Sequence, residues 1–257
     1  MQLILGLGNP GVQYAHNRHN VGFLVIDAIH ERHGFSPWRS RFSAEVSEGR
    51  VGSEKVILAK PTTYMNLSGQ AAGEIARFYK LETADVTVIH DELDLDPGRT
   101  RIKVGGGHGG HNGLKSLDAH LGKDYRRIRV GIGHPGHKDL VSGYVLKDFA
   151  KADQPWVEAV CEELARSINL IFDGKDGDLN GRLNEATAPF RAQPEDAKTS
   201  ASRSDANPRQ AEKTKNKGQS HIRQARNGPA AKVPTKGPMA DMLRKLLGGK
   251  GSLGDKG

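Results

Sequence analysis

The sequence predicts an α/β fold, a single three-layer α/β/α domain with a disordered C-terminal tail. Three observations support this. Strand-like and helix-like segments alternate through the first 190 residues, a pattern typical of helices packed on both faces of one sheet. The length of 257 residues allows a sizeable core. The composition changes sharply after Phe190, so the domain is expected to span residues 1–190 and the tail residues 191–257.

The predicted strands are short apolar runs bounded by glycine or polar turns. The first run leads into a glycine-rich turn. The second and third runs flank a Gly-Ser turn, so these two strands are expected to pair with each other. The predicted strands lie at residues 2–7, 42–51, 55–60, 86–90, 101–104 and 128–132.

The predicted helices have apolar residues spaced three and four apart, which places them on one face. They lie at residues 21–33, 67–79, 112–121 and 156–172. Either Asn66 or Ser68 is expected to cap the second of them.

Charge and cysteine content exclude several classes of protein. The net charge of +8 belongs to the tail, where 15 basic and 6 acidic residues give +9, whereas the first 190 residues carry −1. A nucleic-acid site in the domain must therefore be a local patch. The single cysteine, Cys161, rules out an internal disulfide and a thiolate-rich metal site. Without a signal-like start or an apolar run near the roughly 18 residues of a membrane helix, we expect a cytoplasmic protein with no membrane partner.

The tail contains too few apolar residues to form a core. Between residues 191 and 238 the only large apolar residues are Ile222 and Val233, so this segment is expected to be disordered. Residues 239–247 are the exception, because their apolar residues fall on one helical face. That short helix could contact RNA, an RNA-bound partner or the ribosome, or it could be a frayed end.

Residues 6–11, GLGNPG, match the G-x-G-x-x-G pattern of dinucleotide-binding proteins. We reject that interpretation. Pro10 lacks the backbone N–H that a phosphate-binding turn needs, and the next helical pattern starts about ten residues late. The turn either caps a strand or presents Asn9 at the carboxyl end of that strand, where sites of α/β proteins gather.

Residues 14–20 place a histidine directly before the first predicted helix. His19 could act as a general base near neutral pH. Asn17 or Asn20 could instead serve only as a helix cap.

The acidic run at residues 90–94, HDELD, follows a buried-looking strand. It could hold a divalent metal, orient a histidine or form a solvated turn.

Residues 105–113 contain six glycines and open a predicted helix. Such a segment allows close approach of the backbone to a phosphate or carbonyl oxygen. His108 and His111 have the spacing of a zinc pair, but a zinc site needs a third protein ligand, so no metal is predicted.

Basic residues recur at alternate positions of two predicted strands, where they share a face. They could grip phosphate or form a solvated strand face. They are Arg101, Lys103, Arg126, Arg127 and Arg129.

Together these motifs resemble bacterial peptidyl-tRNA hydrolase over roughly residues 1–185. The resemblance is carried by GLGNPG at 6–11, RHN at 18–20, PTTYMNLSG at 61–69, HDELDL at 90–95, GGGHGGHNGL at 105–114 and RVGIGHPG at 129–136. It implies a monomeric cytosolic esterase on a mixed, mostly parallel sheet, without metal or organic cofactor. Its substrate would be peptidyl-tRNA, contacted at the acceptor stem, the CCA end and the 5′-phosphate.

By residue match, the resemblance implies His19 as catalytic base and Asp91 as its partner. The implied substrate-binding residues are Asn9, Tyr14, Met65, Asn66, His111 and Asn112. The implied phosphate-binding residues are Arg101, Lys103, Arg129 and Lys138. The alternative is a non-catalytic RNA-binding protein on the same fold, like the chloroplast intron-splicing relatives.

Overall fold

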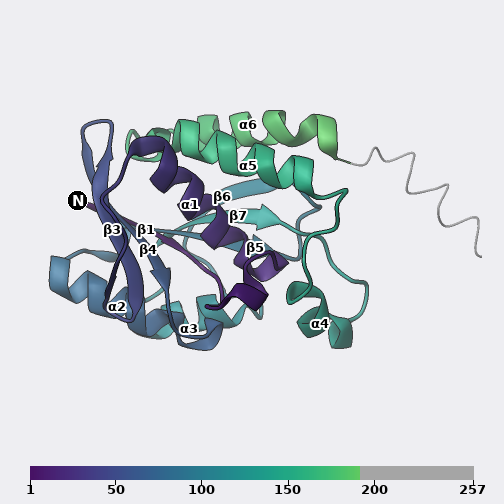
Figure 1. Ribbon diagram of the computed structural model, residues 1–257, viewed down its shortest axis with the longest axis horizontal. Coiled ribbons are helices and arrows are strands. Elements are labelled where there is room, and N and C mark those ends of the chain that lie inside the picture. The colour runs from purple at the N-terminus through teal and green to yellow at the C-terminus, as the bar shows by residue number, and fades with distance from the viewer. Residues whose placement is uncertain (192–257) are drawn as a thin grey trace, which may run out of the picture. The chain divides into compact units, whose positions relative to one another are not determined.

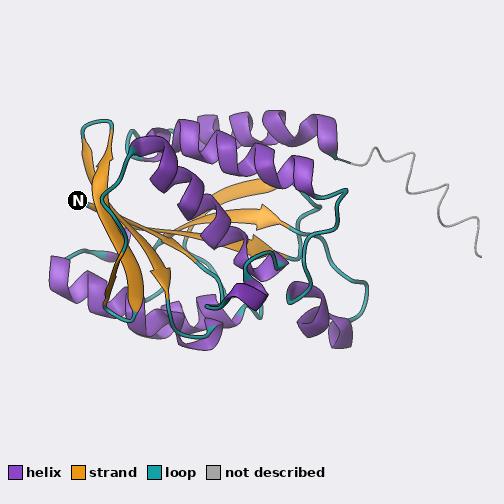
Figure 2. Ribbon diagram, viewed as in Figure 1, coloured by secondary structure: helices purple, strands orange, loops and turns teal. Residues whose placement is uncertain are grey.

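A seven-stranded sheet in the order β2-β3-β4-β1-β5-β7-β6 forms the middle layer of the computed structural model (Figure 2). The structure describes residues 1–191, so the predicted disorder of the tail and the helix at 239–247 lie outside the described residues. The strands are β1 (Gln2–Gly6), β2 (Arg39–Arg41), β3 (Ala44–Val51), β4 (Glu54–Pro61), β5 (Val86–Glu92), β6 (Thr100–Val104) and β7 (Arg126–Gly131).

The sheet is mixed and mostly parallel, as predicted. Strands β4, β1, β5 and β7 run parallel to one another in the centre. The predicted hairpin is confirmed, because β3 pairs antiparallel to β4. Strands β2 and β6 are the antiparallel edge strands, beside β3 and β7.

Helices cover both faces of the sheet, which confirms the three-layer architecture. Helices α1 (Val21–His33), α5 (Gln154–Ser167) and α6 (Asp176–Thr187) lie on one face, whereas α2 (Ser68–Tyr79) and α3 (Asn112–Leu121) lie on the other (Figure 1). Successive strand residues point to opposite faces. Ile4 of β1 therefore packs in the core beneath α1 and α5, while Leu3 and Leu5 pack in the core beneath α2 and α3.

Four elements differ from the predicted ones. The helix predicted at 156–172 ends earlier, because α5 stops at Ser167 and a 3₁₀ turn, Ile168–Ile171, follows it. Helix α6 was not predicted, since only three of its residues are buried within a largely polar sequence. The five-residue helix α4 (Val141–Val145) and the fully exposed β2 are too short to show a period. Within residues 1–191, no helix has the length and apolar character needed to cross a bilayer.

The start of α1 lies directly against the carboxyl ends of β1 and β5. A Cβ atom on Gly22 would approach both the Ile89 carbonyl oxygen and the Leu7 nitrogen to 2.5 Å, and one on Gly6 would approach the Gly22 carbonyl oxygen to 2.4 Å. Side chains of any size are therefore excluded at both glycines. This close approach brings the turn before α1, which carries His19, next to the end of β5, which carries Asp91.

Candidate active site

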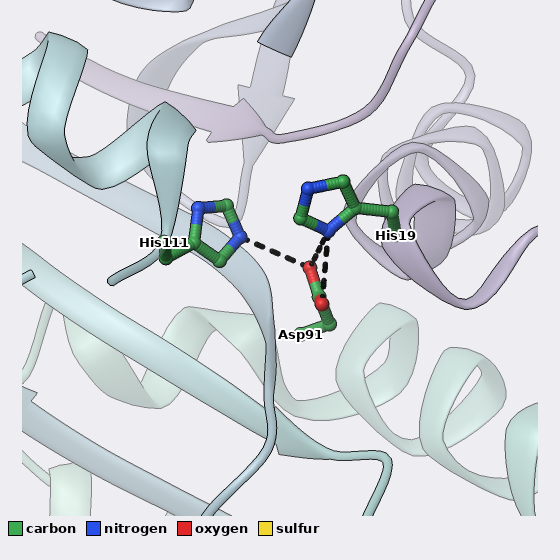
Figure 3. Close-up of side chains that lie close together, drawn as sticks. All are labelled: His19, Asp91 and His111. Atoms are coloured by element: carbon green, nitrogen blue, oxygen red, sulfur yellow. Dashed lines mark hydrogen bonds and ion pairs between the residues drawn. The ribbon is translucent and has the colours of Figure 1, made fainter. Parts of the chain in front are cut away.

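His19 and Asp91 form a buried pair at this junction (Figure 3). His19 Nδ1 lies 2.8 Å from Asp91 Oδ1 and 2.9 Å from Oδ2. A carboxylate only accepts hydrogen bonds, so Nδ1 carries the proton of the neutral ring and Nε2 holds the free lone pair. In the described part of the chain, Nε2 has no hydrogen-bond partner. This arrangement leaves His19 able to accept a proton from a molecule outside the protein.

A second histidine holds Asp91 from the other side. His111 precedes α3, and its Nδ1 accepts hydrogen bonds from the backbone N–H groups of Gly113, at 3.1 Å, and Leu114, at 3.3 Å. The proton of the neutral ring is therefore on Nε2, which donates to Asp91 Oδ1 at 3.0 Å. His111 thus caps α3 and orients Asp91 at the same time.

These contacts set the protonation of the pair. Burial opposes the charge of Asp91, but the facing His19 and His111 lower the pKa of this carboxyl below its usual range. Burial also opposes the charged form of His19, yet the charge and hydrogen bond of Asp91 outweigh it and raise the pKa of the imidazole above its ordinary value. Asp91 therefore stays ionised and favours the protonated form of His19.

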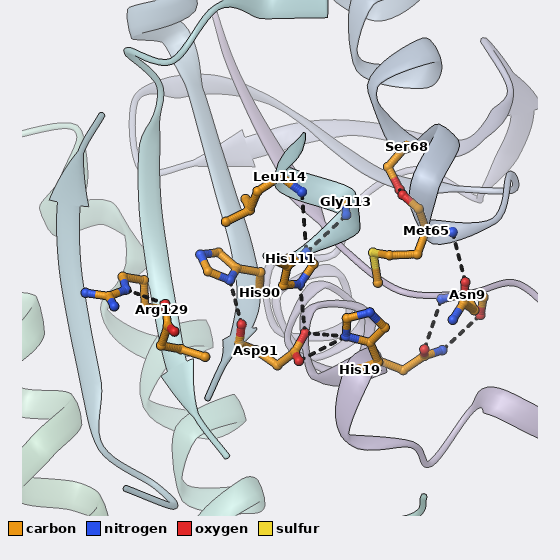
Figure 4. Close-up of polar contacts among 12 residues, drawn as sticks. Asn9, His19, Met65, Ser68, His90, Asp91, His111, Gly113, Leu114 and Arg129 are labelled. Atoms are coloured by element: carbon orange, nitrogen blue, oxygen red, sulfur yellow. Dashed lines mark hydrogen bonds and ion pairs between the residues drawn. The ribbon is translucent and has the colours of Figure 1, made fainter. Parts of the chain in front are cut away.

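The amide of Asn9 has one defined orientation. Its Oδ1 accepts a hydrogen bond from the Met65 backbone N–H at 2.9 Å, so Nδ2 is the end left for a ligand (Figure 4). The Asn20 side chain fixes the backbone of Asn9 with two hydrogen bonds of 2.9 Å. Its Oδ1 accepts from the Asn9 N–H, and its Nδ2 donates to the Asn9 carbonyl oxygen. Asn9 is therefore a preoriented donor.

The interpretation of Asn17, Asn20, Asn66 and Ser68 as helix caps is wrong. None of the helix starts beside them has a side-chain cap bond. Asn17 donates instead to Asp148 at 2.6 Å, and the Ser68 hydroxyl donates to the Met65 carbonyl at 2.9 Å. Asn66 is exposed and points its amide to no protein partner within residues 1–191. These side chains therefore do not cap the helices that follow them.

A cavity of about 850 Å³ joins the expected site residues. Both catalytic candidates, all six substrate-binding candidates and Lys138 line it: His19, Asp91, Asn9, Tyr14, Met65, Asn66, His111, Asn112 and Lys138. The rest of its wall includes an apolar part from α4 and the adjoining residue, with Val141, Val145 and Leu146, and the acidic Glu92 and Asp94 after Asp91. The cavity thus combines amides with an apolar surface, as a site for a peptide requires.

The other basic candidates, on β6 and β7, do not line the cavity. Arg101 pairs with Arg129, and Lys103 with Arg127, in the antiparallel register. Arg101 is exposed, whereas Lys103 and Arg129 are half-buried. The pKa of Lys103 is lowered by burial and by the charges of Arg129 and Arg127, which shows how closely these cations gather.

Arg127 does not belong to an exposed phosphate-binding face. Its side chain is 1% exposed and donates to the carbonyl oxygens of Gly106 and Gly107 at 2.8 and 2.7 Å, and to Asp118 at 3.1 Å. Arg126 pairs with Asp176 of α6 at 3.0 Å. These two arginines support the glycine-rich loop and the packing of α6, so the free basic patch is smaller than the sequence indicates.

His19, Asp91 and His111 present ligand atoms within 4.8 Å of one another, a separation that a metal ion could bridge. The hydrogen bonds argue against that use. Because Nδ1 of His111 accepts two backbone N–H groups, its Nε2 must keep the proton unless the ring becomes an imidazolate. His108, the other half of the suggested zinc pair, is not part of this group. The three residues fit proton transfer better than metal binding.

Two further groups complete the picture of the site. His90, which sequence reasoning did not assign to the site, is buried and bonds through Nδ1 to the Asp91 carbonyl at 2.7 Å. Burial and the neighbouring His111 lower its pKa to about 3, so it is a neutral support for Asp91.

Burial, with smaller contributions from Asp27 and Glu158, raises the pKa of the Cys161 thiol to about 12, which excludes it as a nucleophile.

Comparisons with known proteins identify a single family. The family model described as peptidyl-tRNA hydrolase matches residues 3–191. Curated peptidyl-tRNA hydrolases of Rhizobium etli and Agrobacterium fabrum are 54% and 52% identical, over 98% and 97% of this chain and all of theirs. The crystal structure of peptidyl-tRNA hydrolase from Acinetobacter baumannii superposes with a TM-score of 0.68 at 37% identity, covering 72% of this chain and 94% of the other.

Proposed function

The chain belongs to the peptidyl-tRNA hydrolase family, and we propose that it releases peptide from tRNA by base-catalysed attack of water, with His19 as the base. The bond hydrolysed is the ester between the peptide and the 3′-terminal ribose of tRNA. The observation that carries the assignment is the hydrogen bonding of His19, which lines the cavity: Asp91 holds its Nδ1, while its Nε2 has no hydrogen-bond partner among residues 1–191.

In the proposed step, His19 Nε2 takes a proton from water as the water oxygen attacks the ester carbonyl. The ring becomes a cation that the ionised Asp91 stabilises, and the carbonyl oxygen becomes an oxyanion. When the tetrahedral intermediate collapses, the C–O bond to the ribose breaks and His19 returns the proton to the ribose oxygen. Water and the ester are the only reactants, so the reaction needs no cofactor.

The amides of the cavity supply the remaining polar contacts. Asn9 offers its Nδ2 hydrogens in a fixed orientation, which suits a developing oxyanion or a peptide carbonyl. Asn66 and Asn112 are exposed at the cavity wall and can both donate and accept. Such contacts to the peptide backbone do not depend on its side chains, while Tyr14 and Met65 add apolar surface.

We assign tRNA binding to Arg101, Lys103, Arg129 and Lys138, which would contact the 5′-phosphate and the acceptor stem while the CCA end enters the cavity. A local patch is required, because residues 1–190 carry a net charge of −1. The non-catalytic alternative is not favoured, since curated relatives named as hydrolases match nearly the whole chain.

Cleavage of a defined N-acetylaminoacyl-tRNA tests the activity, and the alternative requires that no free tRNA is released. For the patch, Lys103→Ala is expected to raise KM for this substrate well above the change for a minimal ester without the 5′-phosphate. One lost phosphate contact should also reduce the slope of log affinity against log salt by roughly one. An equal rise in KM for both substrates would mean that Lys103 supports the structure rather than binding the phosphate.

A further inference from the structure

Glu92 follows Asp91 at the end of β5, and both oxygens of its carboxylate are held. Oε2 accepts a hydrogen bond from Arg129 Nε at 2.8 Å, and Oε1 accepts one from the Asp94 backbone N–H at 3.3 Å. The two side chains are mostly buried, at 17% exposed for Glu92 and 14% for Arg129. Figure 4 shows Arg129 on the strand beside that of Asp91, away from His19.

The contact uses only the Nε edge of the guanidinium. Within residues 1–191, neither Nη nitrogen of Arg129 donates a hydrogen bond to the protein. A phosphate prefers to be bound by two parallel N–H donors of one guanidinium. Holding Nε therefore fixes the plane of the group while the pair of Nη donors stays available.

Glu92 also opposes the positive charges that gather on β6 and β7. It is the acidic group that counteracts the effect of Arg129 and Arg127 on the Lys103 ammonium. Its position is unexpected by charge alone, because a carboxylate repels the phosphates that this patch would bind. An acidic group mostly buried at such a place, with both oxygens used, indicates a role in geometry.

We propose that Glu92 is a positioning residue for tRNA binding, which acts by orienting Arg129 toward the terminal phosphate of the acceptor stem. The inference rests on the proposed function of the basic patch. When a flexible arginine binds a phosphate, its side chain loses conformational entropy. An arginine that is already held in its bound orientation loses less of this entropy on binding. Glu92 thus improves affinity although its charge opposes the ligand.

The two effects of Glu92 have opposite signs, so they can be separated. One carboxylate about 8 Å from a phosphate in water weakens binding by about twofold, and by less in salt. Losing the hydrogen bond that orients Arg129 should weaken binding by about three- to tenfold. Positioning is therefore expected to dominate.

The experiment compares the dissociation constants of deacylated tRNA with and without its 5′-phosphate. Glu92→Asp keeps the charge but is one methylene too short for the contact, and Glu92→Ala removes both. Glu92→Asp is expected to bind the phosphorylated tRNA about three- to tenfold more weakly, and Glu92→Ala, which also removes the repulsion, about 1.5- to fivefold more weakly. Both losses should be smaller for the dephosphorylated tRNA. Asp96→Ala is the matched control: it removes an exposed charge from the same turn but outside the cavity, and binding should tighten by no more than about twofold.

Tighter binding by Glu92→Ala, or wild-type binding by Glu92→Asp, would overturn the proposal. If Glu92→Ala melts at a lower temperature, Glu92→Gln provides the test. Its single carbonyl oxygen can still accept from Arg129 Nε, so it should recover part of the lost affinity, and no recovery would count against positioning.

Arg129→Ala separates this inference from the proposed function. If it binds both tRNAs like the wild type, the assignment of the patch itself fails. If it loses affinity for the phosphorylated tRNA while the Glu92 variants do not, only the positioning role is wrong. If Glu92 acts through Arg129, adding Glu92→Ala to Arg129→Ala should cause no further loss.

Discussion

Replacement of Asp91 by asparagine tests how the base is oriented, because it changes one charge and one acceptor at constant size. With its oxygen at the Oδ1 position, Asn would still accept from His111, but its NH₂ group would lie where Oδ2 now lies, 2.9 Å from His19 Nδ1. With the amide reversed, NH₂ would take the Oδ1 position, 2.8 Å from Nδ1, and would face the Nε2–H of His111. In each orientation an NH₂ group lies within 2.9 Å of Nδ1 beside the remaining oxygen, so the tautomer with a protonated Nε2, which cannot act as a base, becomes populated. The negative charge that stabilises the protonated ring is lost as well.

The expected loss in kcat is about 10²- to 10⁴-fold, the usual contribution of a correctly oriented general base. The pH dependence gives a second, independent signature. Neutral His19 is the active form, so activity falls as pH drops through its pKa. Asp91 raises that pKa against the effect of burial, so Asp91→Asn should lower it and move the acid limb of kcat/KM to lower pH.

The assay is kcat/KM for N-acetylaminoacyl-tRNA as a function of pH, with the melting temperature of each variant as a check of the fold. Asp96→Asn, which removes an exposed charge five positions along the chain and outside the cavity, is the matched control and should not move the acid limb. If Asp91→Asn kept the plateau value of kcat/KM seen in the wild type, or if its acid limb moved to higher pH, the role given to Asp91 would be refuted.

Other changes test the parts of the structure around the pair. Asn20→Ala leaves the buried N–H and carbonyl of Asn9 without partners, so urea unfolding should show a loss of about 2–6 kcal/mol and kcat should fall; an unchanged kcat would mean that Asn9 needs no such support. Arg127→Ala leaves the buried Asp118 carboxylate without its cationic partner, although the Tyr125 hydroxyl still donates to it, and should cost about 3–5 kcal/mol; a loss below about 1 kcal/mol would contradict its structural role. Ending the chain at Phe190 removes a net charge of +9, so tRNA affinity and its salt slope should decrease while single-turnover cleavage stays the same; a large drop in melting temperature would show that the tail packs on the domain.

The central strands could be predicted because they are buried on both faces. Residues 86–90 read as one apolar run, and β5 begins at Val86 and has every residue through Asp91 buried. Helix α6 could not be found in this way, because the residues it buries, such as Leu179 and Leu183, are separated by polar ones. The edge strand β2 has no buried residue, so its sequence carries no pattern at all.

In the site, individual residues could be predicted from the sequence, but their contacts could not. The motifs bring attention to His19 and Asp91 as separate candidates, but their pairing depends on the contact of Gly22 with Leu7 and Ile89, which only the folded chain shows. The role of Asn20 was missed for the same reason, since it arises where the turn after β1 meets the start of α1.

Arg127 shows the limit of strand alternation. Alternation puts it on the same face as Arg129, which is correct, but burial differs between the two positions. Asp118 of α3 and the carbonyl groups of the glycine-rich loop cover Arg127. A side chain's partners, rather than its position in the alternation, decide whether it is free to bind phosphate.

The most direct test of the proposed mechanism is single-turnover cleavage of N-acetylaminoacyl-tRNA by His19→Ala with enzyme in excess. Removing the base should slow the chemical step by about 10²- to 10⁴-fold. The affinity for deacylated tRNA should stay within about twofold of the wild type, because the proposed phosphate contacts on β6 and β7 do not involve His19. A folded variant that binds tRNA normally and retains more than about a tenth of the wild-type rate would show that His19 is not the base.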